Sequence, residues 1–357
     1  MRRSSWGTVV AVGIVVLAGA WYWWGHRPAP VRPPTPAEIS PPTSAPMPPS
    51  PTGNGFSGRP AFAVPDVSGG LWVGFLHAGH LQLWHVGAAG PTEAGGYAWA
   101  GPPPALALDT PLGLWLATAT TVTRIVPASK AAPRSWTVAT GQRAVEYLAP
   151  SSDGVWVTVG VAGQAGAAAP VELVAIDPTA PAVTPILAAQ SSAAAAFAPA
   201  PGGLAFGLLA GPGPNAKPLG YWGLFSPSQG RLLQQNALPG GAEGRLVEPA
   251  GGPEEVVATA PTLTGGGPQV VVLDVATARV RPIPLPTQAA QVVGLWRSTD
   301  GSRGVVWARR TAATGTVLAW QHGRATAVAT VPAGALAAAD AHAVYIFTAQ
   351  GMRRIPW

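Results

Sequence analysis

Short, strand-like apolar runs recur along this chain at nearly regular intervals. The seven copies are GLWVGFL (Gly70–Leu76), GLWLATA (Gly113–Ala119), GVWVTVG (Gly154–Gly160), GLAFGLL (Gly203–Leu209), EVVATAP (Glu255–Pro261), GVVWARR (Gly304–Arg310) and AVYIFTA (Ala343–Ala349). Their first residues are 43, 41, 49, 52, 49 and 39 residues apart. A unit of that length holds four short strands, which is the size of one β-propeller blade. The pattern therefore predicts an all-β fold over residues 59–357, a β-propeller of four-stranded antiparallel blades. Seven blades are expected, with six or eight as the alternatives.

Each unit divides into strands at turn residues, and the second unit shows this most clearly. Its predicted strands are PALALD (104–109), GLWLATA (113–119), TVTRIVP (121–127) and SWTVAT (135–140). The last unit has only three predicted strands before Trp357, so a fourth would have to come from the region around Asn54–Arg59. That region is short and Gly-rich. We therefore expect either poor closure or a ring held mainly by packing between blades.

The second strand of most units carries an aromatic residue. These residues are Trp72, Trp115, Trp156, Phe206, Trp307 and Tyr345. In a radial stack of sheets such side chains fill the space between neighbouring blades. Because repeats place equivalent residues among similar neighbours, Trp72, Trp115 and Trp156 are predicted to be core residues of equal importance. An exposed aromatic platform for a polymer is the alternative.

Composition and charge exclude several classes of function. The 45 Gly and 41 Pro residues punctuate the apolar runs as turns do in all-β folds. Residues 1–60 hold five Arg and one Glu, a net charge of +4, whereas the remainder carries 16 basic and 14 acidic residues. A net charge of +2 on the folded part is too small to predict a nucleic-acid partner. The absence of Cys excludes disulfides and thiolate metal sites.

An uncharged apolar segment near the N-terminus predicts a membrane anchor. Trp6–Trp24 (WGTVVAVGIVVLAGAWYWW) has 19 residues, which as a helix rising ~1.5 Å per residue would cross a bilayer core. Arg2 and Arg3 precede it, and a Trp and Tyr cluster ends it as at a membrane interface. We expect residues 1–27 to form a cytoplasmic tail and a single-pass transmembrane helix, a retained signal anchor. A signal peptide cleaved after Ala20 is the alternative. Either way, the remainder of the chain is expected to be extracytoplasmic.

Residues 28–58 form a predicted linker between the anchor and the propeller domain. They are dominated by Pro, Ser and Thr, as in PAPVRPPTPAEISPPTSAPMPPSPTG. Proline fixes φ and lacks an amide donor, so this proline-rich stretch cannot join a sheet. It is expected to be a partly extended polyproline II stalk that holds the head away from the bilayer. An unstructured linker without a selected length is the alternative.

Two kinds of string resemble known bacterial propeller repeats. DVSGGLWVG (Asp66–Gly74) and SSDGVWVT (Ser151–Thr158) resemble repeats of the two-component-regulator type, and VVVLDVATARV (Val270–Val280) resembles YVTN- and WD-like repeats. The resemblance is generic, extends over nearly all of residues 59–357, and lacks the Gly-His and Trp-Asp pairing of true WD repeats. It implies a propeller that serves in interaction or sensing, and it implies no catalytic residues.

Three histidines lie close together in FLHAGHLQLWH. Neutral imidazoles bind zinc or copper, so His77 and His80 are weak candidate metal ligands. However, Ala78-Gly79 has the form of a two-residue hairpin turn that these histidines flank. Strand alternation directs His85 to the opposite face. The sequence therefore favours a polar hairpin tip, and we expect no metal site and no cofactor.

Acidic and basic residues suggest two further binding surfaces. The turns between the first and second strands of five units carry an Asp, which suits a turn because its carboxylate accepts hydrogen bonds from nearby amides. If these residues ring a central channel they are candidate ligands for a cation or polar molecule: Asp66, Asp109, Asp153, Asp300 and Asp340. Four arginines on two adjacent units form a candidate patch for an anionic partner: Arg309, Arg310, Arg353 and Arg354. Ordinary turn capping and solvated strand edges are the alternatives.

No sequence motif for nucleophilic, zinc-hydrolase or nucleotide chemistry occurs in the chain. We therefore expect a non-catalytic binding or scaffolding module in the cell envelope, anchored by its N-terminal helix, with a protein or envelope-polymer partner. One alternative is a propeller enzyme that uses the central channel, such as a hydrolase, a lyase or a quinone-dependent dehydrogenase. The other is a sensory ectodomain that works with a separate signalling partner.

Overall fold

The computed structural model describes residues 56–127, 129, 131–161, 171–189, 193–212, 218–237, 244–248, 254–259, 269–274, 279–284, 291–297, 303–309, 314–321, 324–332, 334–340 and 342–356. The predicted anchor (residues 1–27), and the linker as far as residue 55, lie outside these residues. Within the described part of the chain, no helix is long and apolar enough to cross a membrane. One 3₁₀ turn, η1 (Pro201–Gly203), interrupts an otherwise all-β structure there.

The described strands form seven antiparallel sheets, which we number in chain order. Sheet 1 contains β1 (Arg59–Pro65), β2 (Leu71–His77), β3 (His80–Gly87) and β4 (Gly90–Ala98). Sheet 2 contains β5 (Leu106–Thr110), β6 (Gly113–Ala117), β7 (Thr121–Ile125) and β8 (Arg134–Thr137). Sheet 3 contains β9 (Arg143–Ser151), β10 (Gly154–Val161), β11 (Val171–Ile176) and β12 (Thr184–Ala189). Sheet 4 contains β13 (Ala193–Ala200), β14 (Leu204–Pro212), β15 (Pro218–Ser226) and β16 (Arg231–Ala237).

The second half of the chain repeats this organisation. Sheet 5 contains β17 (Gly244–Glu248), β18 (Glu254–Thr259), β19 (Gln269–Asp274) and β20 (Arg279–Pro284). Sheet 6 contains β21 (Gln291–Arg297), β22 (Arg303–Arg309), β23 (Thr314–Gln321) and β24 (Arg324–Pro332). Sheet 7 contains β25 (Leu336–Ala339), β26 (Ala343–Thr348) and β27 (Gly351–Pro356), and no fourth strand of this sheet lies among the described residues. In every sheet the strands pair in sequence order. The four strands predicted for the second unit correspond to β5, β6, β7 and β8 to within a few residues at each end.

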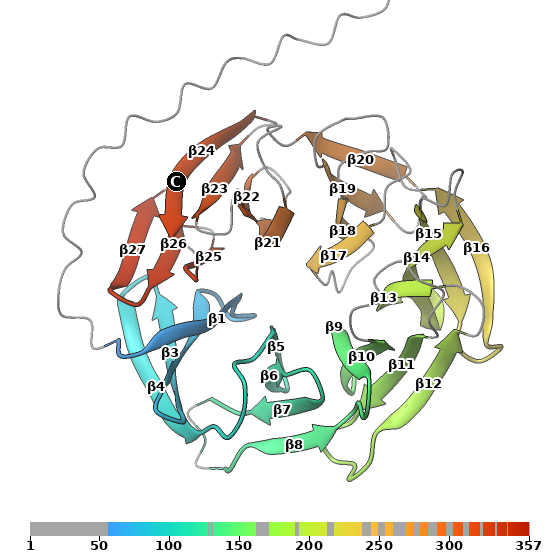
Figure 1. The fold of residues 1–357 in the computed structure, drawn as a ribbon, viewed down its shortest axis with the longest axis horizontal. Coiled ribbons are helices and arrows are strands. Elements are labelled where there is room, and N and C mark those ends of the chain that lie inside the picture. Colours follow the sequence, from blue (N-terminus) through green and yellow to red (C-terminus); the bar gives the residue numbers. More distant parts are fainter. Residues whose placement is uncertain are drawn as a thin grey trace, which may run out of the picture. The chain divides into compact units, whose positions relative to one another are not determined.

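Successive sheets contact one another through their first strands (Figure 1). β1 contacts β5, β5 contacts β9, and the same relation continues through β13, β17 and β21 to β25. β25 in turn contacts β1, so the series of sheets closes on itself. Strands in the middle of this packing are buried on both faces, as in β6, where every residue is buried. The fourth strands β4 and β16 contain no fully buried residue, because no neighbouring strand covers their outer edge, and β16 is mainly exposed.

Side-chain packing joins the first sheet to the last. One core cluster combines Phe75 and Trp84 of sheet 1 with Tyr345 and Phe347 of sheet 7. Phe56, which precedes β1, packs against this cluster: its ring stacks on Phe75 at 4.9 Å and meets Trp84 edge-on at 4.8 Å. The region Asn54–Arg59 is predicted from the sequence to supply a fourth strand to the last sheet. Its described residues instead supply the Phe56 side chain, which packs between sheets 1 and 7, and Arg59, the first residue of β1.

The aromatic residues of the second strands are not equally buried. Trp115 is completely inaccessible to solvent, whereas Trp72 and Trp156 are half-buried. Each packs toward the next sheet along the chain, as the repeat predicts. The Trp115 ring packs against the large ring of Trp136 at 5.6 Å, whereas the Trp72 ring packs against the smaller His85 ring at 4.8 Å. Equal burial of the three Trp residues, expected from the repeat, is therefore not found.

Candidate functional site

The turns between first and second strands share one rim of the fold, since each sheet has the same strand order and the chain enters each sheet at its first strand. This rim carries the predicted acidic residues. Asp66, Asp109, Asp153 and Asp340 lie there, and Asp300 lies outside the described residues. The four described residues have different surroundings and do not form one equivalent ring of open ligands.

Asp66 and Asp109 meet across the joint between sheets 1 and 2. The Asp66 carboxylate accepts hydrogen bonds from the amide and hydroxyl of Ser68 at 2.9 and 2.7 Å, and its Oδ2 lies 2.8 Å from His85 Nε2. The Val67 amide donates to Asp109 Oδ2 at 2.9 Å. Both carboxylates are nearly buried, with side-chain exposure of 6% for Asp66 and residue exposure of 9% for Asp109.

Burial and proximity push the pKa values of these two carboxyls apart. Burial raises the pKa of Asp109 to about 6, with the neighbouring charge of Asp66 acting in the same direction. Burial also acts to raise the pKa of Asp66, but the Ser68 hydrogen bonds, Asp109 and His85 outweigh it and hold that pKa below its ordinary value. The pair therefore shares a proton below about pH 6, with Asp109 as the protonated partner. This arrangement ties two sheets together and leaves little carboxylate surface for a ligand.

Asp340 stabilises its own turn. Its Oδ1 accepts hydrogen bonds from the amides of His342 and Ala343 at 2.7 and 2.9 Å, and the Tyr345 hydroxyl donates to Oδ2 at 3.0 Å. The residue is 7% exposed. These contacts are the Asp turn capping that the sequence offered as the alternative to ligand binding.

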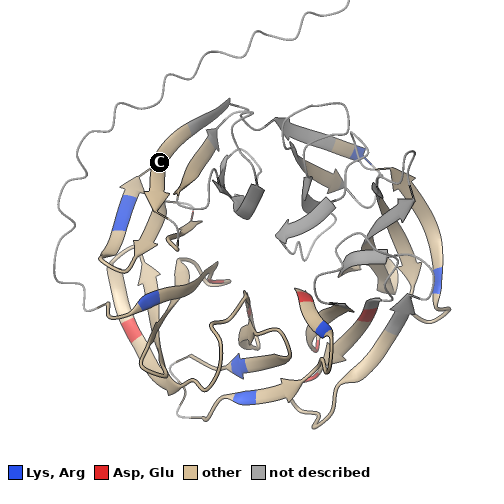
Figure 2. Ribbon diagram, in the orientation of Figure 1, with Lys and Arg blue, Asp and Glu red and all other residues tan. Residues whose placement is uncertain are grey.

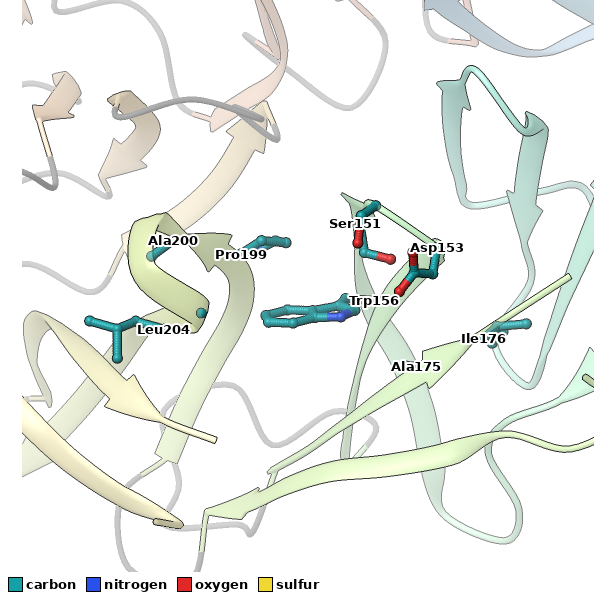
Figure 3. A pocket seen from close by; sticks show the side chains of 10 residues that line it. Ser151, Asp153, Trp156, Ala175, Ile176, Pro199, Ala200 and Leu204 are labelled. Carbon is teal, nitrogen blue, oxygen red and sulfur yellow. The ribbon is translucent and has the colours of Figure 1, made fainter. Parts of the chain in front are cut away.

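Asp153 is exposed and lies at a groove between sheets 3 and 4 (Figure 3). The groove has a volume of about 320 Å³. Its wall on sheet 3 is the half-buried Trp156 indole, with Ser151 and Asp153 above it in the view of Figure 3. Ser152, Ala175 and Ile176 also line the groove on this side. Pro199, Ala200 and Leu204 of sheet 4 line the other side. Asp153 is the one ionisable side chain among the lining residues, so the groove joins an aromatic face to a single negative charge.

Sequence reasoning identified Trp156 and Asp153 separately but missed the groove that they share. A local signal was present in Ala175, a small residue that pairs directly with Trp156 across β10 and β11. A small residue opposite a large aromatic residue leaves the ring face uncovered. Recognising this requires the strand register, which the sequence did not supply at this position.

The histidine candidates lie where the hairpin pattern predicts. His77 and His80 pair across the β2–β3 turn, whose residues Ala78 and Gly79 have positive φ values of 46° and 80°. Both histidines are exposed, whereas His85 lies on the other side, against Trp72 and Asp66. Among the described residues, no group of three or more His, Cys, Asp or Glu side chains has the arrangement of a metal site.

The arginine candidates lie on sheets 6 and 7, which are neighbours. Arg309 ends β22, and Arg310 lies outside the described residues. Arg353 and Arg354 are exposed on β27, where consecutive residues point to opposite faces. Figure 2 shows the charged residues of the described strands scattered among uncharged ones. Because Arg310 lies outside the described residues, the patch of four arginines stays a prediction.

Comparison with solved structures identifies the fold as that of a β-propeller. The WD40 domain of Neurospora crassa Pan2 matches with a TM-score of 0.50 at 12% identity, over 83% of this chain and 88% of that one. A protein from Lactobacillus plantarum matches with a TM-score of 0.50 at 13% identity, over 77% and 85%. A chain of the mitotic checkpoint complex matches with a TM-score of 0.50 at 11% identity, over 83% and 89%. No protein-family model matches the chain, and no curated protein matches it either. At such low identity, these similarities establish the β-propeller fold and nothing more specific.

Proposed function

We propose that this protein is a membrane-anchored, extracytoplasmic β-propeller of seven blades that acts as a non-catalytic binding or scaffolding module for a protein partner in the cell envelope. The blade number is supported by seven spaced repeats in the sequence and by seven sheets among the described residues. A protein partner accords with the fold, since one structural neighbour is a chain of the mitotic checkpoint complex.

The groove at Trp156 is the observation that carries this proposal. A half-exposed Trp beside apolar side chains is a common anchor site in protein interfaces, because it buries much apolar area with little loss of side-chain entropy. The lining holds one ionisable side chain, Asp153, whereas acid–base catalysis generally uses a positioned pair. Both features support binding over catalysis.

The envelope location rests on the N-terminal sequence. The apolar segment Trp6–Trp24 is long enough to span a bilayer, and the Pro-rich residues 28–58 would separate it from the head. A reporter fused after Trp357 should be active outside the cytoplasm and silent inside, and the protein should remain with membranes after a carbonate wash. Recovery of a mature chain that begins at Trp21 would instead establish a cleaved signal peptide.

Site-specific photo-crosslinking in cells tests the binding function. A photoreactive residue in place of Ser152, an exposed residue of the groove, should give a discrete adduct with a partner protein. The same residue in place of Leu233, which is 46% exposed on the outer strand β16, serves as the matched control and should give none. Filling the groove with Ala175→Arg should abolish the Ser152 adduct. Absence of an adduct at Ser152, or an adduct that survives the filled groove, would contradict the proposal.

A further inference from the structure

The sheets of this protein provide internal comparisons for the groove. The aromatic position of the second strand pairs with a defined position on the third strand. Four of the pairs are Trp72 with His85 in sheet 1, Trp115 with Arg124 in sheet 2, Trp156 with Ala175 in sheet 3, and Tyr345 with Arg354 in sheet 7. The other two are Phe206 with Leu224 in sheet 4 and Trp307 with Val317 in sheet 6. Three of these six sheets thus place a basic residue opposite the aromatic residue, two place a large apolar residue there, and sheet 3 places an alanine.

The basic side chains of sheets 1 and 2, His85 and Arg124, make the same two kinds of contact, one with the aromatic ring and one with a main-chain carbonyl oxygen. The His85 ring lies 4.8 Å from the Trp72 ring, and the guanidinium carbon of Arg124 lies 6.0 Å from the centre of the Trp115 ring. Each side chain also reaches the carbonyl oxygen of the residue that precedes the turn Gly. His85 Nε2 lies 3.2 Å from Gly69 O, and Arg124 Nε donates to Leu112 O at 2.6 Å.

Sheet 7 holds a third basic residue at this position, Arg354, which pairs with Tyr345 across β26 and β27. In sheet 4 a different arrangement closes the space: Phe206 is fully buried and its ring stacks with Trp222 at 5.9 Å. In sheet 3 the aromatic ring of Trp156 lies beside an open groove.

The residue of sheet 3 that corresponds to Gly69 and Leu112 is Asp153, which directly precedes Gly154. The groove therefore has the aromatic face and the carbonyl position that receive His85 and Arg124 in the other sheets, and it adds an exposed carboxylate. The electron-rich face of an indole and a carboxylate both attract a cation. The position opposite Trp156, where sheets 1 and 2 have His85 and Arg124, therefore combines groups that suit an arginine side chain.

We propose that the Trp156 groove binds the guanidinium group of an arginine side chain supplied by the protein partner. The inference rests on the proposed binding function and specifies its ligand. A guanidinium is flat enough to stack on the indole, and its fork of N–H donors can reach the Asp153 carboxylate and main-chain carbonyl together. A lysine ammonium is a compact, strongly hydrated charge and matches this arrangement less well.

Defined small probes test this chemistry on the full-length chain in detergent. Ligand-observed NMR would measure binding of N-acetyl-arginine methylamide, its lysine analogue, and the citrulline analogue, which is uncharged and nearly the same shape. We expect the arginine probe to bind with a Kd on the order of 1–10 mM, since a single side chain makes few contacts. The citrulline probe should bind at least about tenfold more weakly, because it lacks the charge that both ring and carboxylate attract.

Variants of the groove measure separately how the Asp153 charge and the open space opposite Trp156 contribute to arginine binding. Asp153→Asn should weaken arginine binding about fivefold, as expected for loss of an exposed ion pair. Asp177→Asn removes a negative charge from the next turn of the same sheet, outside the groove lining, and should change Kd by less than about twofold. Ala175→Arg places the protein's own arginine where sheet 2 has Arg124 and should abolish binding. Because Asp153 is exposed, its substitution should leave the fold intact even if Ala175→Arg does not.

The outcomes show separately whether the arginine proposal fails and whether the proposed protein-binding function fails. Equal binding of the arginine and citrulline probes, or an unchanged Kd in Asp153→Asn, would overturn the arginine proposal. If the crosslink from the Ser152 position persisted in either case, the binding function would stand with a different ligand. If the protein with the photoreactive residue at Ser152 gave no crosslink but the arginine probe still bound, the protein-partner function would be refuted. The groove would then be a site for free guanidinium compounds.

Discussion

Truncation of Trp115 should destabilise this propeller more than truncation of the equivalent Trp in either neighbouring sheet. Trp115 is 0% exposed, and its Nε1 donates a hydrogen bond to Thr110 Oγ1 at 3.1 Å. A buried Trp removes roughly 200 Å² from water, worth about 5 kcal/mol at 25 cal/mol/Å². Measured Trp→Ala losses in protein cores lie at about 3–5 kcal/mol, so we expect that range for Trp115→Ala.

The two half-buried Trp residues should show smaller losses. Trp72→Ala and Trp156→Ala each remove a ring that is already partly solvated, so about half the apolar term is lost, or roughly 1.5–3 kcal/mol. Trp115→Phe is a useful intermediate, because it keeps most of the apolar contact and removes the bond to Thr110. It should cost about 1–2 kcal/mol.

Urea unfolding of the full-length chain, followed by far-UV circular dichroism, measures these differences. Comparison of midpoints is meaningful if the slope of unfolding free energy against urea is the same in all variants. Equal losses for the three Ala variants would show that burial in the structure does not govern their contributions. A loss below about 1 kcal/mol for Trp115→Ala would refute its assignment to the core between sheets 2 and 3.

Of three further predictions, two concern joints between sheets and one concerns the close approach of two strands within sheet 3. The pKa of Asp109 is raised from 3.8 to about 6. The stability that its protonated form contributes is therefore present below about pH 4 and is lost as the pH rises through 6. Asp66 has a lowered pKa, so its contribution to stability changes with pH in the opposite direction. Asp109→Asn should therefore become more stable relative to wild type between pH 4 and 7, by up to about 3 kcal/mol, and a constant difference in urea midpoints across that range would contradict this. Gly154→Ala should cost more than about 3 kcal/mol, because a Cβ there would meet a backbone carbonyl oxygen, whereas Gly96→Ala, which has open space, should stay within about 1 kcal/mol in the same urea titration. Phe56→Ala should cost about 2 kcal/mol and speed amide hydrogen exchange in sheets 1 and 7, and unchanged exchange would show that Phe56 does not support their joint.

The strand pattern of this protein could be predicted from its sequence because it depends on local signals. Apolar runs bounded by Gly, Pro and Asp define strands whatever their neighbours are, and the spacing of Gly70, Gly113 and Gly154 defines the repeat. The same local logic predicted the hairpin at Ala78-Gly79, where both residues adopt positive φ. The three-stranded last sheet also follows from the spacing of its turns.

Only the tertiary structure determined how equivalent positions differ. The repeat predicts that Trp72, Trp115 and Trp156 are alike, yet Trp115 is fully buried whereas Trp72 and Trp156 are half-buried. Likewise, the rim aspartates are equivalent by sequence, but Asp109 meets the turn of another sheet and Asp153 borders a groove. Turn and strand propensities act between residues near in sequence, whereas burial, pKa and open space depend on which distant residues pack together. In a repeat fold, that packing leaves an open groove beside one repeat and a buried joint beside another.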